Sequence, residues 1–222
     1  MKYTIGIIDE EKDQIANIRR TIKFNKPKDL CTDDLVFIEY SLDGDGARLP
    51  QKLCDNVLND VLDGSIHTLI IDYRIISESA LVEGTDIYKL IVQAVPKFPV
   101  IILTNVPGDC YTKAFVDADK VYWKAKFFKL KEDYAREKTA NIFRNMDNYK
   151  FQRAELVTRL SENLSKLHSN GYTAEDLQRV LNIESELGDF FPQQQTEIEK
   201  ALSVSDLHDA VALLEEARNL LG

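Results

Sequence analysis

The sequence predicts an α/β fold, a doubly wound five-stranded parallel sheet, followed by an all-α C-terminal module. First, strand-like and helix-like segments alternate up to residue 127, a pattern that gives parallel sheets with right-handed crossovers. Second, the segment 66–72, Ile-His-Thr-Leu-Ile-Ile-Asp, is an almost unbroken apolar run, typical of a strand buried on both faces. Third, no strand pattern follows residue 127.

The predicted strands are short segments rich in β-branched and aromatic residues. They span residues 3–8, 35–42, 66–72, 98–103 and 121–123. Apolar residues at three- and four-residue spacing predict the intervening helices, one ending at residue 25, others at 49–62 and 86–95, and a short one at 110–116. A long loop is expected at residues 73–84, after the third strand.

The C-terminal part carries helical patterns alone. Neither Pro nor Gly interrupts residues 127–170, which permits one long helix or two with a bend near Asn148. Further helices are predicted to begin at Thr173, Pro192 and Ser205. We therefore expect two domains, a sheet domain at residues 1–145 and an acidic helical module at residues 146–222.

An apolar spacing of three and four residues runs through the long helical region. It comprises Ile142, Met146, Tyr149, Leu156, Leu160 and Leu167. Two interpretations stay open: a coiled-coil-like contact that makes a homodimer, or an amphipathic helix packed on its own domain.

Charge and composition exclude some functions. The net charge is −9, and residues 153–222 carry six basic against thirteen acidic side chains, which argues against nucleic-acid binding. No apolar run reaches the roughly 18 residues of a membrane span, and the N-terminus reads as a strand rather than a signal peptide. The three cysteines, Cys31, Cys54 and Cys110, fit neither a disulfide framework nor a zinc site, so we expect reduced thiols in a cytoplasmic protein.

Chemically active residues follow four of the five predicted strands. They are Asp9 with Glu10, then Asp72, Thr104 and Lys124. In a parallel sheet these positions share the carboxyl edge, where such folds bind ligands. Three carboxylates there need a cation, and oxygen ligands suit Mg²⁺. Asp72 could then attack a phosphoryl group, while Lys124 and Thr104 stabilise the transferred charge.

This ordered set resembles the receiver domain of two-component response regulators, over about residues 1–145. Family members carry an acidic pair after the first strand, which Asp9 and Glu10 match, and a phosphoacceptor aspartate after the third, which Asp72 matches. Thr104 and Lys124 match the remaining two positions. The resemblance implies a flavodoxin-like sheet of order 2-1-3-4-5, Mg²⁺ as cofactor, and a histidine kinase or phosphotransfer protein as the phosphoryl donor.

The chain also departs from the family pattern. The loop after Asp72 is longer than usual, Ala125 stands where a proline commonly follows the lysine, and Asn105 stands where a small residue is common. The aromatic switch position holds Val121. Arg74 could approach a phosphate or face solvent.

These residues suggest three functions. The first is a signalling receiver, phosphorylated on Asp72, that is not otherwise an enzyme and acts through protein–protein contacts of its helical tail with a downstream partner. The second is a receiver-like scaffold, a protein-interaction module that is never phosphorylated. The third, a hydrolase with an Asp72 nucleophile, is disfavoured because the position of a general acid, two residues on, is Arg74.

Overall fold

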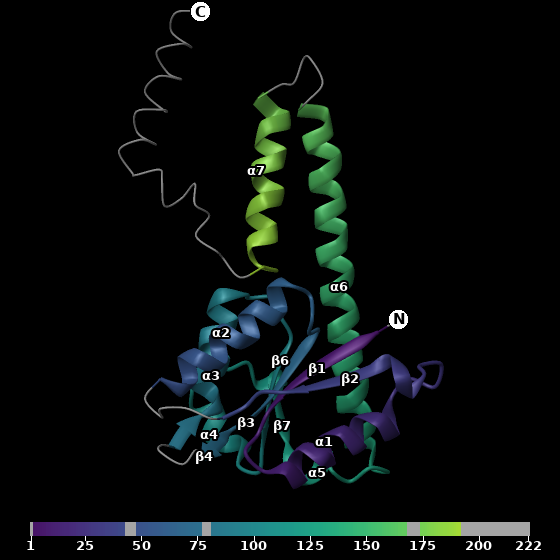
Figure 1. Ribbon diagram of the computed structural model, residues 1–222, viewed down its shortest axis with the longest axis vertical. Helices are drawn as coiled ribbons and strands as arrows, with labels where there is room; N and C mark the ends of the chain where they lie inside the picture. Colours follow the sequence, from purple (N-terminus) through teal and green to yellow (C-terminus); the bar gives the residue numbers. More distant parts are fainter. Residues whose placement is uncertain (1, 43–47, 77–80, 168–173, 192–222) are drawn as a thin grey trace, which may run out of the picture. The chain divides into compact units, whose positions relative to one another are not determined.

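The computed structural model describes residues 2–42, 48–76, 81–167 and 174–191, which belong to one compact unit, Met1–Pro192 (Figure 1). Its centre is a five-stranded, all-parallel sheet of order β2-β1-β3-β6-β7. The strands are β1 (Tyr3–Ile8), β2 (Leu35–Glu39), β3 (Thr68–Asp72), β6 (Val100–Thr104) and β7 (Val121–Trp123). The predicted fold class and strand order are therefore confirmed.

Seven helices accompany the sheet in the described part of the chain. They are α1 (Lys12–Asn25), α2 (Leu49–Leu62), α3 (Gly84–Ala94), α4 (Pro107–Tyr111), α5 (Lys124–Phe127), α6 (Asp133–Leu167) and α7 (Ala174–Gly188). Two 3₁₀ turns, η1 (Thr32–Asp34) and η2 (Ala118–Lys120), precede β2 and β7. The α4 helix begins at Pro107, three residues before the predicted start, because proline suits a first helical turn.

The side chains of the sheet alternate between two hydrophobic cores, as strand geometry requires. In β3, Leu69 and Ile71 enter one core while Ile70 enters the other. The first core lies under α2 and α3, and the second lies under α1 and the N-terminal part of α6 (Figure 1). Helices on both faces explain why β3 reads as a continuous apolar run.

The loop predicted after the third strand contains a small antiparallel hairpin, β4 (Arg74–Ile76) with β5 (Leu81–Glu83). The prediction of a long loop at 73–84 missed these two strands, which lie in the described part of that segment. Ile75 and Val82 are buried in the α2–α3 core, so the hairpin is held by packing as well as by its backbone hydrogen bonds. The apolar signal was hidden because each strand is only three residues long.

The long C-terminal helix is continuous but starts later than expected. Residues 128–132 form turns, α6 begins at Asp133, and no bend divides it near Asn148. The domain boundary expected between residues 145 and 146 therefore falls inside α6. Four residues of its apolar spacing lie in the cores of the same chain: Ile142, Met146, Tyr149 and Leu156. This supports the packed amphipathic helix over the coiled coil.

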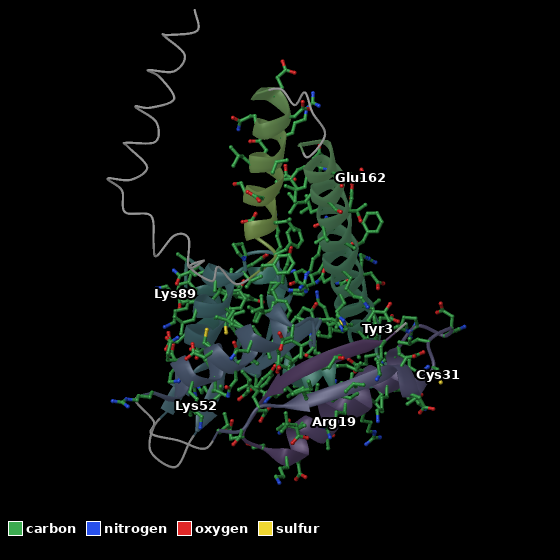
Figure 2. The ribbon with its side chains drawn as sticks, turned by 45° about the horizontal axis from the view of Figure 1, so that its top comes forward. Tyr3, Arg19, Cys31, Lys52, Lys89 and Glu162 are labelled. Atoms are coloured by element: carbon green, nitrogen blue, oxygen red, sulfur yellow. The ribbon has the colours of Figure 1, made fainter. Side chains whose placement is uncertain are left out.

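The middle of α6 is fixed to the sheet domain by polar contacts. The Tyr3 hydroxyl donates to Asp147 Oδ1 at 2.6 Å (Figure 2 labels Tyr3 beside the long helix). The Arg153 guanidinium donates to the carbonyls of Val61 and Leu62 at 3.4 and 3.2 Å, satisfying the C-terminal end of α2. Arg153, which interrupts the apolar spacing, is thus a helix-capping residue.

The α7 helix lies alongside the C-terminal half of α6 (Figure 1). Just beyond its end, the Tyr149 hydroxyl donates to the carbonyl of Phe190 at 2.8 Å, and the two rings stack. Among the described helices, none combines the length and the apolar character needed to cross a membrane. The helices predicted to begin at Pro192 and Ser205 lie outside the described residues.

Gly84, at the start of α3, allows a close backbone approach to the end of β3. Its N–H donates to the carbonyl of Tyr73 at 2.7 Å, and a Cβ there would overlap the carbonyl oxygen of Asp72. We predict that Gly84→Ala lowers the free energy of unfolding by about 1–3 kcal/mol or more, as overpacking does. Gly108→Ala is the control, since a Cβ at Gly108 meets nothing within 4 Å. Equal urea midpoints for both variants would contradict this.

His67 couples stability to pH. Its Nδ1 accepts the N–H of Thr4 at 2.8 Å, while burial and the charges of Lys150 and Arg153 lower its pKa from 6.5 to about 4. Because the unfolded chain then binds the proton first, stability from this group is present above pH 6.5 and is lost as pH falls toward 4. His67→Asn, which keeps an acceptor, should lose less stability than the wild type over this range in chemical denaturation. Parallel pH profiles would refute the assignment.

Candidate functional site

Four neighbouring strands deliver the predicted site residues to one edge of the sheet. Asp9 follows β1, Asp72 ends β3, Thr104 ends β6, and Lys124 follows β7. The parallel register keeps the strand ends level, with Ile8 opposite Ile71, Asp72 opposite Leu103, and Thr104 opposite Trp123. The structure therefore brings together all the side chains that the sequence singled out.

Lys124 is the central cation of this edge. Its Nζ lies 2.6 Å from Asp72 Oδ1 and 3.1 Å from Asp9 Oδ2. The side chains of Lys124 and Asp9 are 7 % and 1 % exposed, so this is a buried ion pair rather than a surface one. Asp9 Oδ1 accepts the N–H of Glu11 at 2.9 Å, which fixes the carboxylate. This contact joins the ends of β1, β3 and β7, and removing one partner would leave a buried charge uncompensated.

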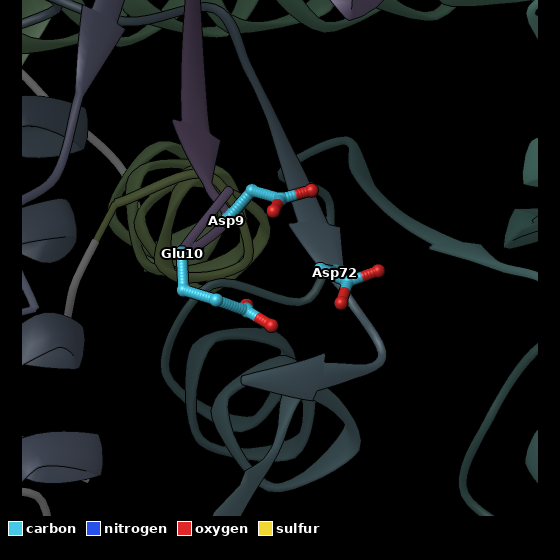
Figure 3. A group of neighbouring side chains, drawn as sticks. All are labelled: Asp9, Glu10 and Asp72. Atoms are coloured by element: carbon cyan, nitrogen blue, oxygen red, sulfur yellow. The ribbon is translucent and has the colours of Figure 1, made fainter. Parts of the chain in front are cut away.

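The carboxylates outnumber the ammonium. Oxygen atoms of Asp9, Glu10 and Asp72 all lie within 4.8 Å of one another, and Figure 3 shows the three side chains converging from the ends of β1 and β3. Glu10 Oε2 is buried and has no hydrogen-bond partner among the described residues. A buried carboxylate oxygen without a partner is costly unless a cation is nearby. This acidic cluster could therefore bind a metal ion.

Burial and mutual repulsion disfavour the charged forms of Glu10 and Asp72. Burial, with the charges of Asp72 and Asp9, raises the pKa of Glu10. Burial also raises the pKa of Asp72, an effect that the Lys124 ammonium opposes and the Asp9 charge reinforces. Although burial disfavours its charge, the carboxylates of Asp72 and Asp9 raise the pKa of Lys124. Lys124 thus remains an ammonium while the carboxylates gain from a further cation.

A pocket of about 280 Å³ opens over these groups. Glu10, Asp72, Thr104 and Lys124 line it. The Thr104 hydroxyl oxygen accepts the N–H of Val106 at 3.0 Å, which leaves its proton available to a ligand. The pocket therefore brings together a carboxylate, an ammonium and a hydroxyl donor.

The structure adds pocket residues to which the sequence analysis gave no role. Tyr73 and Val106 line the pocket, and so does Arg74, whose function was left open. The Arg74 guanidinium pairs with Asp109 of α4 at 3.1 Å. All three residues lie within two positions of Asp72 or Thr104 in the sequence, and this closeness could have identified them.

The departures from the receiver pattern also have places in the structure. Asn105 is exposed and lines the pocket. Ala125 lies in α5, so a helix begins directly at Lys124. Val121 and Tyr122 are both buried, and the Tyr122 ring packs near Phe127. A buried Tyr122 is a core residue in this conformation.

Comparison with known proteins does not assign a family: no protein-family model matches the chain, and no curated protein matches it either.

Divalent-cation binding at the acidic cluster is testable by titration. We predict that Mg²⁺ or Mn²⁺ binds and that Glu10→Gln weakens binding at least about tenfold, since it removes one of three anionic ligands. Binding should also weaken as pH falls, because protons compete for carboxyls whose pKa values are raised. Glu11→Gln, next in the chain, is the control. Calorimetry that shows equal affinities for Glu10→Gln and Glu11→Gln would contradict the site.

Proposed function

We propose that this protein is a signal-transduction receiver that accepts a phosphoryl group on Asp72 with the help of Mg²⁺. The observation that supports this most strongly is the grouping of Asp72, Thr104 and Lys124 in one pocket beside the acidic pair Asp9 and Glu10. Asp9 and Glu10 both follow β1, whereas the other three residues come from the ends of three further strands. The grouping is therefore a product of the fold rather than of local sequence.

The proposal gives each group a role that its position supports. Lys124 holds Asp72 Oδ1, so the other carboxylate oxygen is the one presented for attack on phosphorus. A new oxygen–phosphorus bond forms an acyl phosphate as the bond to the donor's leaving group breaks, and the leaving group takes its electron pair. The Lys124 ammonium and the Thr104 hydroxyl then donate to phosphoryl oxygens, which stabilises the negative charge.

The acidic cluster fits the metal that this chemistry needs. Asp9, Glu10 and Asp72 would hold Mg²⁺, and the partnerless Glu10 Oε2 is the oxygen that gains most from it. When bound, the ion neutralises the charge of the carboxylates and of the phosphoryl oxygens. The protein would then be a phosphoacceptor, with a histidine kinase or phosphotransfer protein as donor and a protein partner, reached through its helical region, as the recipient of the signal.

The second candidate is a receiver-like scaffold that binds partners without phosphorylation. The buried contact of Lys124 with Asp9 and Asp72 favours the scaffold, because a purely structural role, joining three strand ends, is sufficient to explain it. The exposed Asn105 at the pocket also supports it, since a larger side chain there restricts access.

Phosphorylation distinguishes the two. Incubation with Mg²⁺ and acetyl phosphate should add one phosphoryl group to the intact mass, and Asp72→Asn should abolish the gain. Asp133→Asn is the matched control, because the Asp133 side chain is 95 % exposed at the start of α6. An unmodified wild-type mass, with Mg²⁺ bound and the chain folded, would favour the scaffold.

A further inference from the structure

Four charged side chains connect the β4–β5 hairpin with the α4 region beside the pocket. Arg74 pairs with Asp109 at 3.1 Å, and Glu83 pairs with Lys113 at 2.8 Å. Arg74 and Glu83 are opposite each other in the hairpin register, and Asp109 and Lys113 are four residues apart. We call these four residues the hairpin–α4 clamp. Because it joins β4, which follows Asp72, to α4, which follows Thr104, it links the regions that follow β3 and β6.

Arg74 is the member of the clamp that also belongs to the pocket. It lines the pocket with Asp72 and Lys124, and its guanidinium lies 5.7 Å from the centre of the Tyr73 ring. Its side chain is 61 % exposed, and that of Asp109 is 48 % exposed, so solvent weakens their pairing. Arg74 is therefore a cation at the pocket mouth that is held only weakly by its present partner.

We propose that Arg74 leaves Asp109 and binds the phosphoryl group when Asp72 is phosphorylated, thereby releasing α4 from the hairpin. This inference rests on the proposed function. Phosphorylation replaces one carboxylate charge by a group carrying more negative charge and three acceptor oxygens. A guanidinium fits such oxygens with two parallel hydrogen bonds, an arrangement stronger than an exposed ion pair.

The exchange would act on a part of the chain able to respond. The α4 helix is only five residues long, and two clamp pairs tie its region to the hairpin. Cys110, between Asp109 and Tyr111, is fully buried in the α2–α3 core. Loss of the Arg74–Asp109 pair leaves Glu83–Lys113 as the remaining clamp contact. Because Cys110 lies in α4, movement of α4 away from the core would expose its thiol, and the reactivity of that thiol reports the release.

Beryllofluoride, a phosphoryl mimic, tests the exchange in the full chain with Mg²⁺. Trp123, the one tryptophan of the sequence, adjoins Lys124 and supplies a fluorescence signal. Arg74→Gln should weaken beryllofluoride binding about tenfold, and Asp109→Asn should strengthen it by about threefold because Arg74 loses its competing partner. Arg136→Gln is the control, since Arg136 is 64 % exposed and pairs with Asp133. Equal affinities for Arg74→Gln and Arg136→Gln would overturn the inference.

Thiol labelling tests the release of α4. Cys31 is exposed and should react at once, whereas Cys54 and Cys110 are buried. With beryllofluoride bound, the rate at Cys110 should rise in the wild type but not in Arg74→Gln, while Cys54 stays slow. A rate at Cys110 that beryllofluoride leaves unchanged in the wild type would overturn the release.

Failure of the inference differs from failure of the proposed function. If wild-type Asp72 is phosphorylated but Arg74→Gln binds beryllofluoride as the wild type does, Arg74 has no role and the receiver assignment stands. If neither acetyl phosphate nor beryllofluoride acts on the wild type, the proposed function itself fails, and the inference fails with it.

Discussion

The buried contact of Lys124 with Asp9 and Asp72 is the interaction on which the reactive edge depends. Lys124 lies 115 positions after Asp9 and 52 positions after Asp72 in the sequence. The three side chains meet where β1, β3 and β7 end. Removing an ammonium and two carboxylates from water is expensive, and their attraction repays this only in good geometry. With Glu10 adding a third carboxylate, the edge stays short of positive charge. The same excess of carboxylate charge that makes the site costly to fold makes it suited to a cation.

The sheet supplies the precision that this contact needs. Two helix-covered cores fix β1, β3, β6 and β7 from both faces, so the strand ends are set by packing rather than by the polar groups themselves. Gly84 shows how tight the arrangement is, because only a residue without a side chain fits against the carbonyl of Asp72. Rigid support of this kind is what lets a few side chains hold a reactive geometry.

The sequence predicted the sheet because buried strands carry a strong local pattern. It predicted the grouping of site residues because the carboxyl ends of parallel strands share one edge of the sheet. A buried strand is a continuous apolar run, and its end is marked by the first polar residue, as at Asp72 and Thr104. The sequence did not predict the hairpin after Asp72, because a strand of three residues is too short to show a recognisable alternation of apolar and polar residues. A single helix across residue 145 was one of the two alternatives that the sequence left open. The capping role of Arg153 escaped, since it depends on contacts with the end of α2 about 90 positions away in the chain. Arg74 was noticed only as a neighbour of Asp72, because its partner Asp109 is brought close by the fold.

The α6 helix connects the reactive edge with the opposite edge of the sheet. Near its start, the Tyr134 hydroxyl accepts the N–H of Trp123, beside Lys124, at 2.8 Å. One continuous helix of about 50 Å, at 1.5 Å per residue, runs from there past the anchoring contacts of Tyr149 and Arg153 to the pairing with α7. A helix fixed at both edges moves as a unit, so a change at Lys124 that shifts β7 acts on α6 directly. Under the proposed function, α6 would be the physical route from Asp72 to the helical region, and the hairpin–α4 clamp would be a second route that starts at the hairpin after Asp72.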